Sequence, residues 1–164
     1  MNRSKPLRIW GGFSLKFRVE EFNDVFKEIE PFFQAHYDEL ATLKDKMPKV
    51  DPDLALFANL EAAGRWHVVT AREAGALVGY FWGVLMPHPH YKYVSMCSAD
   101  AYYLAPDYRK AQNGILFIQF IEQSLKERGV QLLVMGTKMQ RDLGVLYEML
   151  HFTETDRVFR KWLQ

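Results

Sequence analysis

The stretch YYLAPDYRKAQNGILFIQF, residues 102–120, decides the fold because its character changes twice. It begins as an apolar, strand-like run, stops at Pro106, passes through a polar loop and becomes a strongly apolar helix. A strand, a polar loop with a glycine and the start of a helix form a geometry in which backbone N–H groups can bind a phosphate. The stretch therefore predicts an anion-binding loop around residues 109–115.

The composition indicates one globular domain over residues 1–164. The chain is 49% hydrophobic and 15% aromatic, which is enough apolar material for a core. Twenty-one Lys and Arg against 20 Asp and Glu leave a net charge of +1, which favours neither nucleic acid nor a membrane surface as partner. The only cysteine, Cys97, excludes an intrachain disulfide and a multi-cysteine metal site. We expect it to pack as a small apolar group in a strand.

The N-terminal residues MNRSKPLRIWGGF carry positive charge but no apolar run long enough for a signal peptide. Nowhere do about 20 apolar residues occur together, as a membrane span would require. With a lone cysteine suited to a reducing compartment, these features predict a cytoplasmic protein.

The first third of the chain has the periodicity of helices. Apolar residues recur at helical spacing over 22–29 and, after Pro31, over 33–40, which predicts two short helices or one kinked helix. In the sequence DPD, Asp51 is the expected N-cap and Pro52 the first residue of a third helix, covering roughly 52–63.

From Trp66 the pattern changes to strands. WHVVTAR (66–72) and LVGYFWGVLM (77–86), joined by a turn at EAGA, predict a hairpin. A loop, PHPHYK (87–92), precedes YVSMCSADAYYL (93–104), which is too long for an ordinary strand unless it bends or carries a bulge. We expect this long strand to be the central one.

The main helix that follows has an apolar side and ends at Gly129. VQLLVMGT (130–137) then predicts a buried strand, DLGVLYEML (142–150) a helix and RVFRKWL (157–163) a closing strand. The order predicts an α+β fold, with a central mixed, mostly antiparallel twisted sheet, a splayed long strand and helices on both faces. The apolar side of the main helix consists of Phe117, Ile118, Ile121 and Leu125.

This order, with a proline-arginine loop before the main helix, resembles the GNAT superfamily of acyl-CoA N-acyltransferases over nearly the whole chain. The family loop reads R/Q-x-x-G-x-G/A, and its backbone amides hold the pyrophosphate of acetyl-CoA. Arg109, Gln112 and Gly114 match that loop here. The resemblance implies acetyl-CoA as co-substrate, bound by Tyr102, Tyr103, Leu104, Arg109, Lys110, Ala111, Gln112, Asn113, Gly114 and Ile115.

Two further similarities support the resemblance. GVLYEMLHF is similar to the family's late helix, and it places Tyr147 on the tyrosine that protonates the leaving thiolate in many members. More narrowly, HPHYKY, ADAYYLAPDYR and GTKMQRDLG resemble GNAT-like proteins encoded by phages and prophages, some of them virion-associated.

The chain departs from the family pattern at two positions. Gln112 replaces the first loop glycine, and His151 replaces the glycine before the final Phe152. If residue 112 needed a positive φ, glutamine would cost on the order of 1 kcal/mol there. Asn113, which tolerates left-handed geometry, is then the residue able to take that role.

Asp100 and Tyr147 are the candidate catalytic residues. A lysine-like amine has a pKa of about 10.4 and must lose a proton before it attacks. Asp100, expected on the same strand face as Tyr102 and Leu104, is placed to accept that proton through water. The alternatives are a structural carboxylate for Asp100 and plain core packing for Tyr147. A main-chain N–H of residues 103–105 is expected to bind the oxyanion.

His88 and His90 alternate with prolines and lack a third ligand nearby, so they indicate a substrate-side loop and no metal site. Several aromatic residues are candidates either for an acceptor pocket or for the core. They are Phe33, Tyr37, Trp82, Tyr91 and Tyr93.

The leading hypothesis is an enzyme that transfers an acetyl or short acyl group from acetyl-CoA to a primary amine by direct attack. The acceptor is a small-molecule or protein amine, and a homodimer is left open. The alternative is a phage or prophage structural protein that keeps the fold without catalysis. A nucleic-acid-binding module is disfavoured, because basic and aromatic residues are not interleaved on one element.

Overall fold

The computed structural model describes residues 15–47, 49–110 and 112–163, so the predictions for residues 1–14 and for Ala111 lie outside the described residues. None of the helices within these ranges is long and apolar enough to cross a membrane. The elements are β1 (Lys16–Val19), α1 (Phe22–Ile29), η1 (Glu30–Phe32), α2 (Phe33–Leu40), α3 (Leu54–Ala62), β2 (Trp66–Glu73), β3 (Ala76–His88), β4 (Tyr91–Leu104), η2 (Pro106–Tyr108), α4 (Asn113–Glu127), β5 (Leu132–Val134) and α5 (Gly144–Met149).

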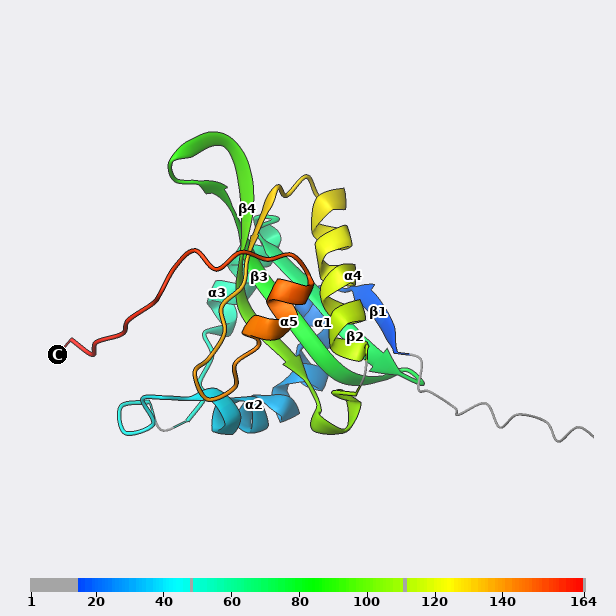
Figure 1. The fold of residues 1–164 in the computed structure, drawn as a ribbon. Coiled ribbons are helices and arrows are strands. Elements are labelled where there is room, and N and C mark those ends of the chain that lie inside the picture. The colour runs from blue at the N-terminus through cyan, green and yellow to red at the C-terminus, as the bar shows by residue number, and fades with distance from the viewer. Residues whose placement is uncertain (1–14, 48, 111, 164) are drawn as a thin grey trace, which may run out of the picture.

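The five strands form one sheet in the order β1-β2-β3-β4-β5 (Figure 1). The pairs β1–β2, β2–β3 and β3–β4 are antiparallel, and β4–β5 is parallel. The predicted mixed, mostly antiparallel sheet is therefore confirmed. The middle position belongs to β3, however, and the prediction that β4 is central is wrong. The sequence reading also missed β1, an edge strand with three of its four residues exposed.

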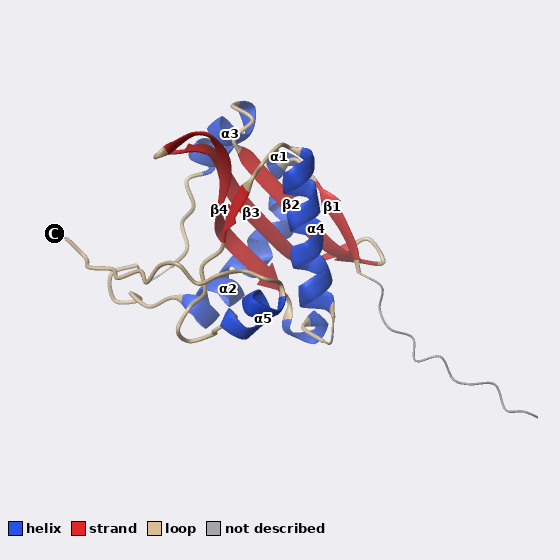
Figure 2. Ribbon diagram, turned by 45° about the horizontal axis from the view of Figure 1, so that its top comes forward, coloured by secondary structure: helices blue, strands red, loops and turns tan. Residues whose placement is uncertain are grey.

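Helices cover both faces of the sheet, as predicted: α4 lies on one face, with α1 and α2 on the other (Figure 2). The core on the α4 side contains Cys97 and the predicted apolar side of that helix. Burial raises the pKa of the Cys97 thiol to about 12, so this cysteine is an inert packing group. The core on the other side is mostly aromatic and includes Phe22, Phe33, Trp66, Tyr80, Trp82 and Tyr103.

The helix boundaries follow local chemistry. Pro31 lies in the 3₁₀ turn between α1 and α2, which confirms two short helices. The N-cap of α3 is Asp53, whose Oδ1 accepts a hydrogen bond from the Leu56 amide at 2.9 Å. The prediction of Asp51 as N-cap is wrong because the side chain two residues later reaches the free amide. Gly129, with φ of 75°, follows α4 as predicted.

Strands β3 and β4 form a hairpin that projects beyond the rest of the molecule (Figure 1). β3 continues to His88 and β4 starts at Tyr91, so the predicted loop 87–92 shrinks to a turn at residues 89–90. Trp82 pairs with Ala101 and Gly83 with Ala99, which leaves Asp100 as an extra residue in β4. The predicted bulge in the long strand is therefore confirmed, and it lies at Asp100.

The predicted closing strand is not formed. Residues 153–163 have no regular structure and are exposed, although RVFRKWL has the composition of a strand. A strand needs a hydrogen-bonded neighbour, and no strand of the described chain pairs with this segment. The sheet therefore ends at β5.

Candidate active site

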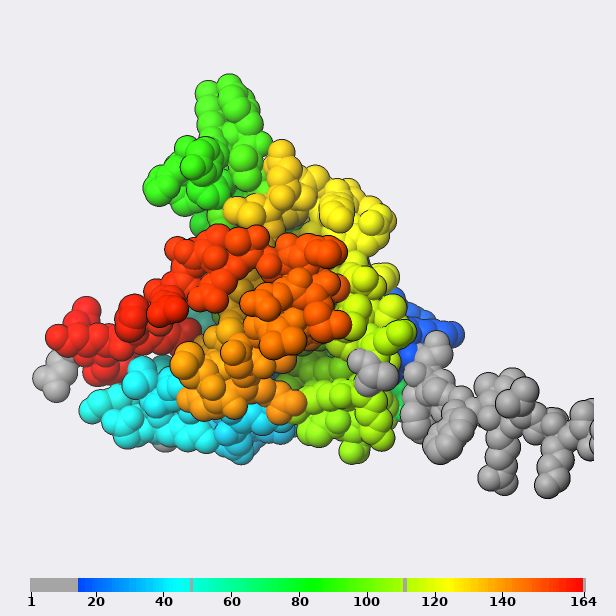
Figure 3. All heavy atoms as spheres, in the orientation of Figure 1, coloured from blue at the N-terminus to red at the C-terminus, as the bar shows by residue number. Residues whose placement is uncertain are grey.

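A cavity of about 1150 Å³ opens where β4 and β5 separate. The two strands pair only from Met96 to Ser98, and β4 then continues to Leu104 without β5 beside it. Residues of α2 and of the loop 41–52 line one side, and Gly114, Leu146 and Tyr147 line the other. The cavity therefore passes through the plane of the sheet. In the space-filling view, the orange segment around α5 lies between the cyan α2 region and the yellow-green α4 (Figure 3).

The N-terminus of α4 faces this cavity with backbone donors available. The amides of Lys110, Gln112 and Gly114 make no hydrogen bond to another described residue, and the N-cap Gln112 has no side-chain bond to the helix. The Asn113 amide donates to the Lys110 carbonyl oxygen at 3.1 Å. Amides that bond no described residue and the positive end of a 15-residue helix make this a site that favours an anion.

The loop position that differs from the family pattern has an ordinary backbone conformation. Gln112 has φ of −90° and ψ of −3°, so no glycine is required there, and the left-handed role foreseen for Asn113 is wrong because Asn113 is already helical. The Asn113 side chain instead donates to the Tyr108 carbonyl oxygen at 2.9 Å.

Gly114 keeps the space above the helix end open. A Cβ placed on it would meet the Tyr102 hydroxyl at 3.5 Å and Leu146 Cδ2 at 3.7 Å. The fold tolerates those contacts, yet the methyl group would occupy the cradle between β4 and α5. Tyr102 reaches the same point, with its hydroxyl donating to the Gly114 carbonyl oxygen at 3.3 Å. Ile115 is half-buried in the same cavity wall.

Arg109 joins the anion-binding loop to α2. Its Nη2 donates to both carboxylate oxygens of Glu39, at 2.8 and 3.0 Å, and its Nε donates to the Leu104 carbonyl oxygen. The guanidinium also lies 5.3 Å from the centre of the Tyr103 ring. A carboxylate therefore already pairs with this charge, and the expected contact of Arg109 with acetyl-CoA stays a prediction.

The direction of the β4 backbone amides narrows the candidates for the oxyanion donor. The Ala105 amide donates to the Val78 carbonyl oxygen at 2.8 Å, so it faces β3. Alternation along the strand turns the Tyr103 amide the same way and the amides of Tyr102 and Leu104 toward the cavity. The predicted range of residues 103–105 therefore narrows to Leu104.

Asp100 lies on the α1–α2 side of the sheet. Its Oδ2 accepts a hydrogen bond from Trp82 Nε1 at 2.8 Å, and Trp82 and Tyr103 belong to the aromatic core. Tyr102 and Leu104 pack in the opposite core, so the prediction that Asp100 shares their face is wrong. The bulge causes the error, because an extra residue reverses the in-out alternation after position 100. The exposed carboxylate of Asp100 and residues of α2 line the same cavity.

Tyr147 lies on the α4 side of the cavity. Its hydroxyl donates to the Gly136 carbonyl oxygen at 3.2 Å, and its ring packs against Phe152. Burial, and then the charge of Asp142, raises the pKa of Tyr147 to about 12, so the phenol stays protonated at neutral pH. Asp100 and Tyr147 thus line the same cavity from opposite faces of the sheet.

The sequence reading missed His36. This α2 residue lines the cavity, and its ring lies tilted against the Tyr103 ring with 5.0 Å between the ring centres. Its Nδ1 lies 2.7 Å from the buried Tyr80 hydroxyl. Burial lowers the pKa of His36 to about 4, so the ring is neutral at pH 7. Its helical spacing with Phe32 and Phe33 is the only signal that the sequence carries.

Of the residues proposed for an acceptor pocket, Phe33, Tyr37 and Trp82 line the cavity, whereas Tyr91 and Tyr93 lie exposed on the projecting hairpin. In that hairpin, the His90 amide donates to His88 Nδ1 at 3.1 Å. Within the described ranges, no three His, Cys, Asp or Glu side chains come together as a metal site would require.

No family model and no curated protein matches the sequence. The fold, in contrast, matches solved acetyltransferase structures. An aminoglycoside acetyltransferase from an uncultured soil metagenomic sample has a TM-score of 0.70 at 15% identity, covering 92% of this chain and 95% of that one. The ribosomal-protein-alanine N-acetyltransferase of Brucella melitensis has a TM-score of 0.69 at 20% identity, with 92% and 99% covered.

A predicted acetyltransferase of Clostridium acetobutylicum, solved with acetyl-CoA, has a TM-score of 0.65 at 16% identity, with 92% of this chain and 95% of that one covered. The chain therefore has the fold of the GNAT superfamily. The narrower resemblance to phage-encoded proteins stays a prediction.

Proposed function

We propose that this chain is an N-acyltransferase that moves an acetyl or other short acyl group from acetyl-CoA to a primary amine by direct attack. The observation that carries the proposal is the cavity through the sheet. It joins an anion-binding helix end on one face to an exposed carboxylate among aromatic residues on the other. Such a passage lets two substrates meet end to end within it.

The residues present fit acetyl-CoA, which would supply an activated thioester. The amides around Gln112 and Gly114 are placed for a pyrophosphate, and the absence of a Cβ at Gly114 lets it approach the helix end. The Leu104 amide, facing the opening between β4 and β5, is placed to hold the thioester carbonyl oxygen as negative charge develops there.

Asp100 would act on the acceptor amine. Its carboxylate can hold an ammonium group, and water can carry one proton from that group to the carboxylate before the nitrogen attacks. Trp82 Nε1 bonds only Oδ2 of Asp100, so Oδ1 remains for the acceptor amine. The aromatic walls around this carboxylate suit the apolar part of an amine.

Tyr147 would act on the leaving sulfur. The carbon–sulfur bond breaks as the carbon–nitrogen bond forms, and the phenol can turn from the Gly136 carbonyl oxygen to the developing thiolate. Because a thiol pKa is near 8.5, full proton transfer from a phenol of pKa about 12 runs uphill by roughly 5 kcal/mol. The phenol would therefore act first as a hydrogen-bond donor to the sulfur, and the proton that the nitrogen loses on becoming an amide would end on the thiolate.

The first experiment measures thermal unfolding with and without acetyl-CoA. A ligand at 100 times its Kd stabilises the folded state by about 2.7 kcal/mol, which is a clear rise in Tm. Gly114→Ala should abolish most of the rise and fold normally, while Gln119→Ala, on the exposed side of α4, should keep it. No rise at millimolar acetyl-CoA would favour a non-catalytic structural protein.

The second experiment measures turnover on a panel of small-molecule and peptide amines. Asp100→Asn and Tyr147→Phe should keep the acetyl-CoA shift and lower kcat by about 100-fold or more. The activity of Asp100→Asn should recover as pH rises and the free amine becomes common. Unchanged rates in both variants would refute these roles.

A further inference from the structure

Some of the charged side chains that line the cavity have partners within the cavity wall. Glu39 pairs with Arg109 at 2.8 Å and lies 3.7 Å from Arg141, so one carboxylate serves two guanidinium groups. Asp142 accepts a hydrogen bond from the Gly144 amide at 2.8 Å. These contacts therefore use both carboxylates to hold the wall in place.

Two cations in the cavity wall lack such a partner. Lys49 and Asp51, on the loop after α2, have opposite charges and lie two residues apart. The charged residues that remain in the wall are Asp100, Lys138 and Arg160. Neither Lys138 nor Arg160 forms an ion pair with a carboxylate of the described residues. The described part of the protein therefore leaves the charges of these two cations to a ligand.

A turn after β5 positions Lys138 in the wall. The Arg141 amide donates to the Lys138 carbonyl oxygen at 2.9 Å, which closes the turn. The Leu143 amide donates to Thr137 Oγ1 at 2.7 Å and ties the start of the turn to the residues before α5. Lys138 is half-buried, so its backbone and part of its side chain are held by the fold.

The charges of Lys138, Arg160 and Asp100 act on one another. Burial, and then the charge of Arg160, lowers the pKa of Lys138, while the charge of Asp100 acts in the opposite direction. Beyond the effect of burial, Asp100 and Lys138 also have opposite effects on the pKa of His36, in the α2 wall. The three charges therefore lie within electrostatic range of one another on the α2 side of the cavity. Two neighbouring cations repel, and an anion bound to both offsets the repulsion.

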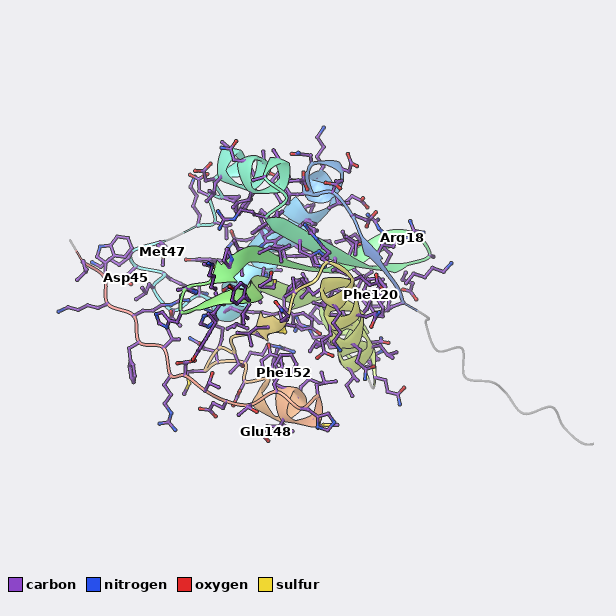
Figure 4. The ribbon with its side chains drawn as sticks, turned by 90° about the horizontal axis from the view of Figure 1, so that it is seen from above. Arg18, Asp45, Met47, Phe120, Glu148 and Phe152 are labelled. Atoms are coloured by element: carbon purple, nitrogen blue, oxygen red, sulfur yellow. The ribbon has the colours of Figure 1, made fainter. Side chains whose placement is uncertain are left out.

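Arg160 comes from the C-terminal segment, residues 153–163, which passes the rim of the cavity. Seen from above, this segment starts at Phe152 and runs toward the side on which Asp45 and Met47 lie (Figure 4). The space-filling view shows the same red segment next to the cyan region around α2 and the loop after it (Figure 3). Met47 and Arg160 both line the cavity. The segment therefore adds a positive charge on the side where the acceptor enters.

We propose that the acceptor is a small amine that also carries an anionic group, either a carboxylate or a phosphate. Lys138 and Arg160 bind the anionic group, and Asp100 holds the ammonium group, so both charges of the acceptor are paired. This acceptor belongs to the proposed function, on which the inference rests. The pyrophosphate of acetyl-CoA is placed at the N-terminus of α4, on the opposite face of the sheet, and so leaves these two cations to the acceptor.

The first test compares matched pairs of amines in acetyl transfer. Amino acids with one to five carbons between amine and carboxylate are each paired with their amide, and phosphoethanolamine is paired with ethanolamine. The anionic member of the best pair should have a kcat/KM at least about 10-fold higher, because contacts between charged groups are among the strong ones. The pair with the largest ratio shows whether the group is a carboxylate or a phosphate. Equal or lower values for every anionic member would overturn the proposal.

Variants assign the preference to the two cations. Lys138→Met should reduce the ratio between the paired amines by about 10-fold, and Arg160→Gln, at the exposed rim, by about 3-fold. Lys138→Glu should reverse the preference, so that a diamine reacts faster than the amino acid of the same length. Arg157→Gln is the matched control, because Arg157 lies in the same segment, pairs with Glu154 and does not line the cavity. A ratio that stays at the wild-type value in Lys138→Met would contradict the assignment.

Thermal unfolding separates this proposal from the proposed function. With CoA in place of acetyl-CoA no transfer occurs, and a millimolar anionic amine should raise Tm further while its neutral partner should not. No Tm rise with acetyl-CoA and no transfer to any amine would refute the proposed function. A Tm rise with acetyl-CoA, with neither transfer nor a further rise for any anionic amine, would overturn the anionic acceptor alone. Loss of the acetyl-CoA rise in Lys138→Met would also overturn it, because the lysine then binds the co-substrate.

Discussion

The half of the sheet formed by β1, β2 and β3 differs from the half formed by β4 and β5 in where polar side chains find their partners. Around β1, β2 and β3, the buried residues Arg72 and His67 find their partners inside the protein: Arg72 binds Glu20 and Glu28, and His67 binds Ser124 and Arg128. Trp66 Nε1 and Glu73 Oε1 are the buried side-chain atoms without a hydrogen-bond partner among the described residues. Around β4 and β5, polar groups face a cavity instead. The comparison separates polar groups that stabilise the fold from polar groups that line the cavity.

In the half formed by β1, β2 and β3, a buried ion-pair cluster around Arg72 holds the elements together. The Arg72 side chain is 8% exposed, and its guanidinium bonds two carboxylates and the Gly75 carbonyl oxygen. Its partners lie before α1 and within α1, so this cluster fastens the N-terminal helices to β2. In the second half the corresponding connection is Arg109 to Glu39, which ties the anion-binding loop to α2 beside the cavity.

Removing Arg72 should have the largest effect on stability. Arg72→Met leaves Glu20 unpaired against the core and should lower the free energy of unfolding by about 3–4 kcal/mol. Urea denaturation measures the change. Arg141→Met, whose side chain is 45% exposed at 3.7 Å from Glu39, is the control and should lose less than about 1 kcal/mol. Equal losses in both variants would contradict the distinction between the halves.

Acid should destabilise the first half through His67. Ser124 donates to the Ile121 carbonyl oxygen, so His67 Nε2 donates to Ser124 Oγ at 2.8 Å, and Nδ1 accepts from Arg128 at 3.2 Å. Burial, and then the Arg128 charge, lowers the pKa of His67 to about 4, so below pH 6.5 the unfolded chain binds more protons. This histidine alone should lower stability by about 2–3 kcal/mol from pH 7 to 4.5.

Denaturation at several pH values measures this slope. His67→Gln keeps a donor and an acceptor but gains no proton, so the fall should become shallower, with the part due to His36 remaining. A variant whose stability falls as steeply as that of the wild type would show that His67 is not the group that titrates.

Gly79 tests the boundary between the halves. A Cβ there would lie 2.7 Å from the Tyr103 carbonyl oxygen and 2.8 Å from Leu104 Cδ1, so Gly79→Ala must push β4 away from β3. We expect a loss of about 2 kcal/mol in unfolding free energy and weaker acetyl-CoA binding, because the Leu104 amide moves. Gly136→Ala, which meets nothing within 4 Å, is the control for stability.

The smallest expected effect is an increase in the free energy of unfolding. His151 has φ of 64°, a left-handed conformation that a non-glycine residue adopts at a cost of about 1 kcal/mol. His151→Gly should therefore raise the unfolding free energy by up to about 1 kcal/mol in a thermal or urea melt. A destabilised variant would show that the histidine side chain makes a contact worth more than the strain.

Much of the fold was predictable because periodicity marks each buried element from Trp66 to Gly129. The edge strand β1 was not predicted, because an exposed strand does not require alternating apolar residues. The closing strand was predicted from composition alone, but strand formation depends on a neighbouring edge that the sequence does not reveal. The N-cap of α3 was misplaced by two residues for a local reason, the choice between Asp51 and Asp53.

The site was predictable where its chemistry is local. The loop pattern around Gly114 pointed to free amides, and the amides of Gln112 and Gly114 bond no described residue. The partner of Arg109 was not predictable, because Glu39 lies far away in sequence on another element. The sheet face on which Asp100 lies was also not predictable, because a bulge shifts the alternation of side chains between the two faces and composition does not reveal a bulge.

Because position 100 is an extra residue in β4, this strand should tolerate the deletion of one residue there. Shortening a strand by one residue ordinarily turns every later side chain inside out. Omitting Asp100 would instead let Ala99 and Ala101 follow regular pairing with Gly83 and Trp82, with both cores undisturbed. The carboxylate therefore lies on a residue that the sheet can do without, and under the proposed function its loss would stop acyl transfer and leave the fold intact.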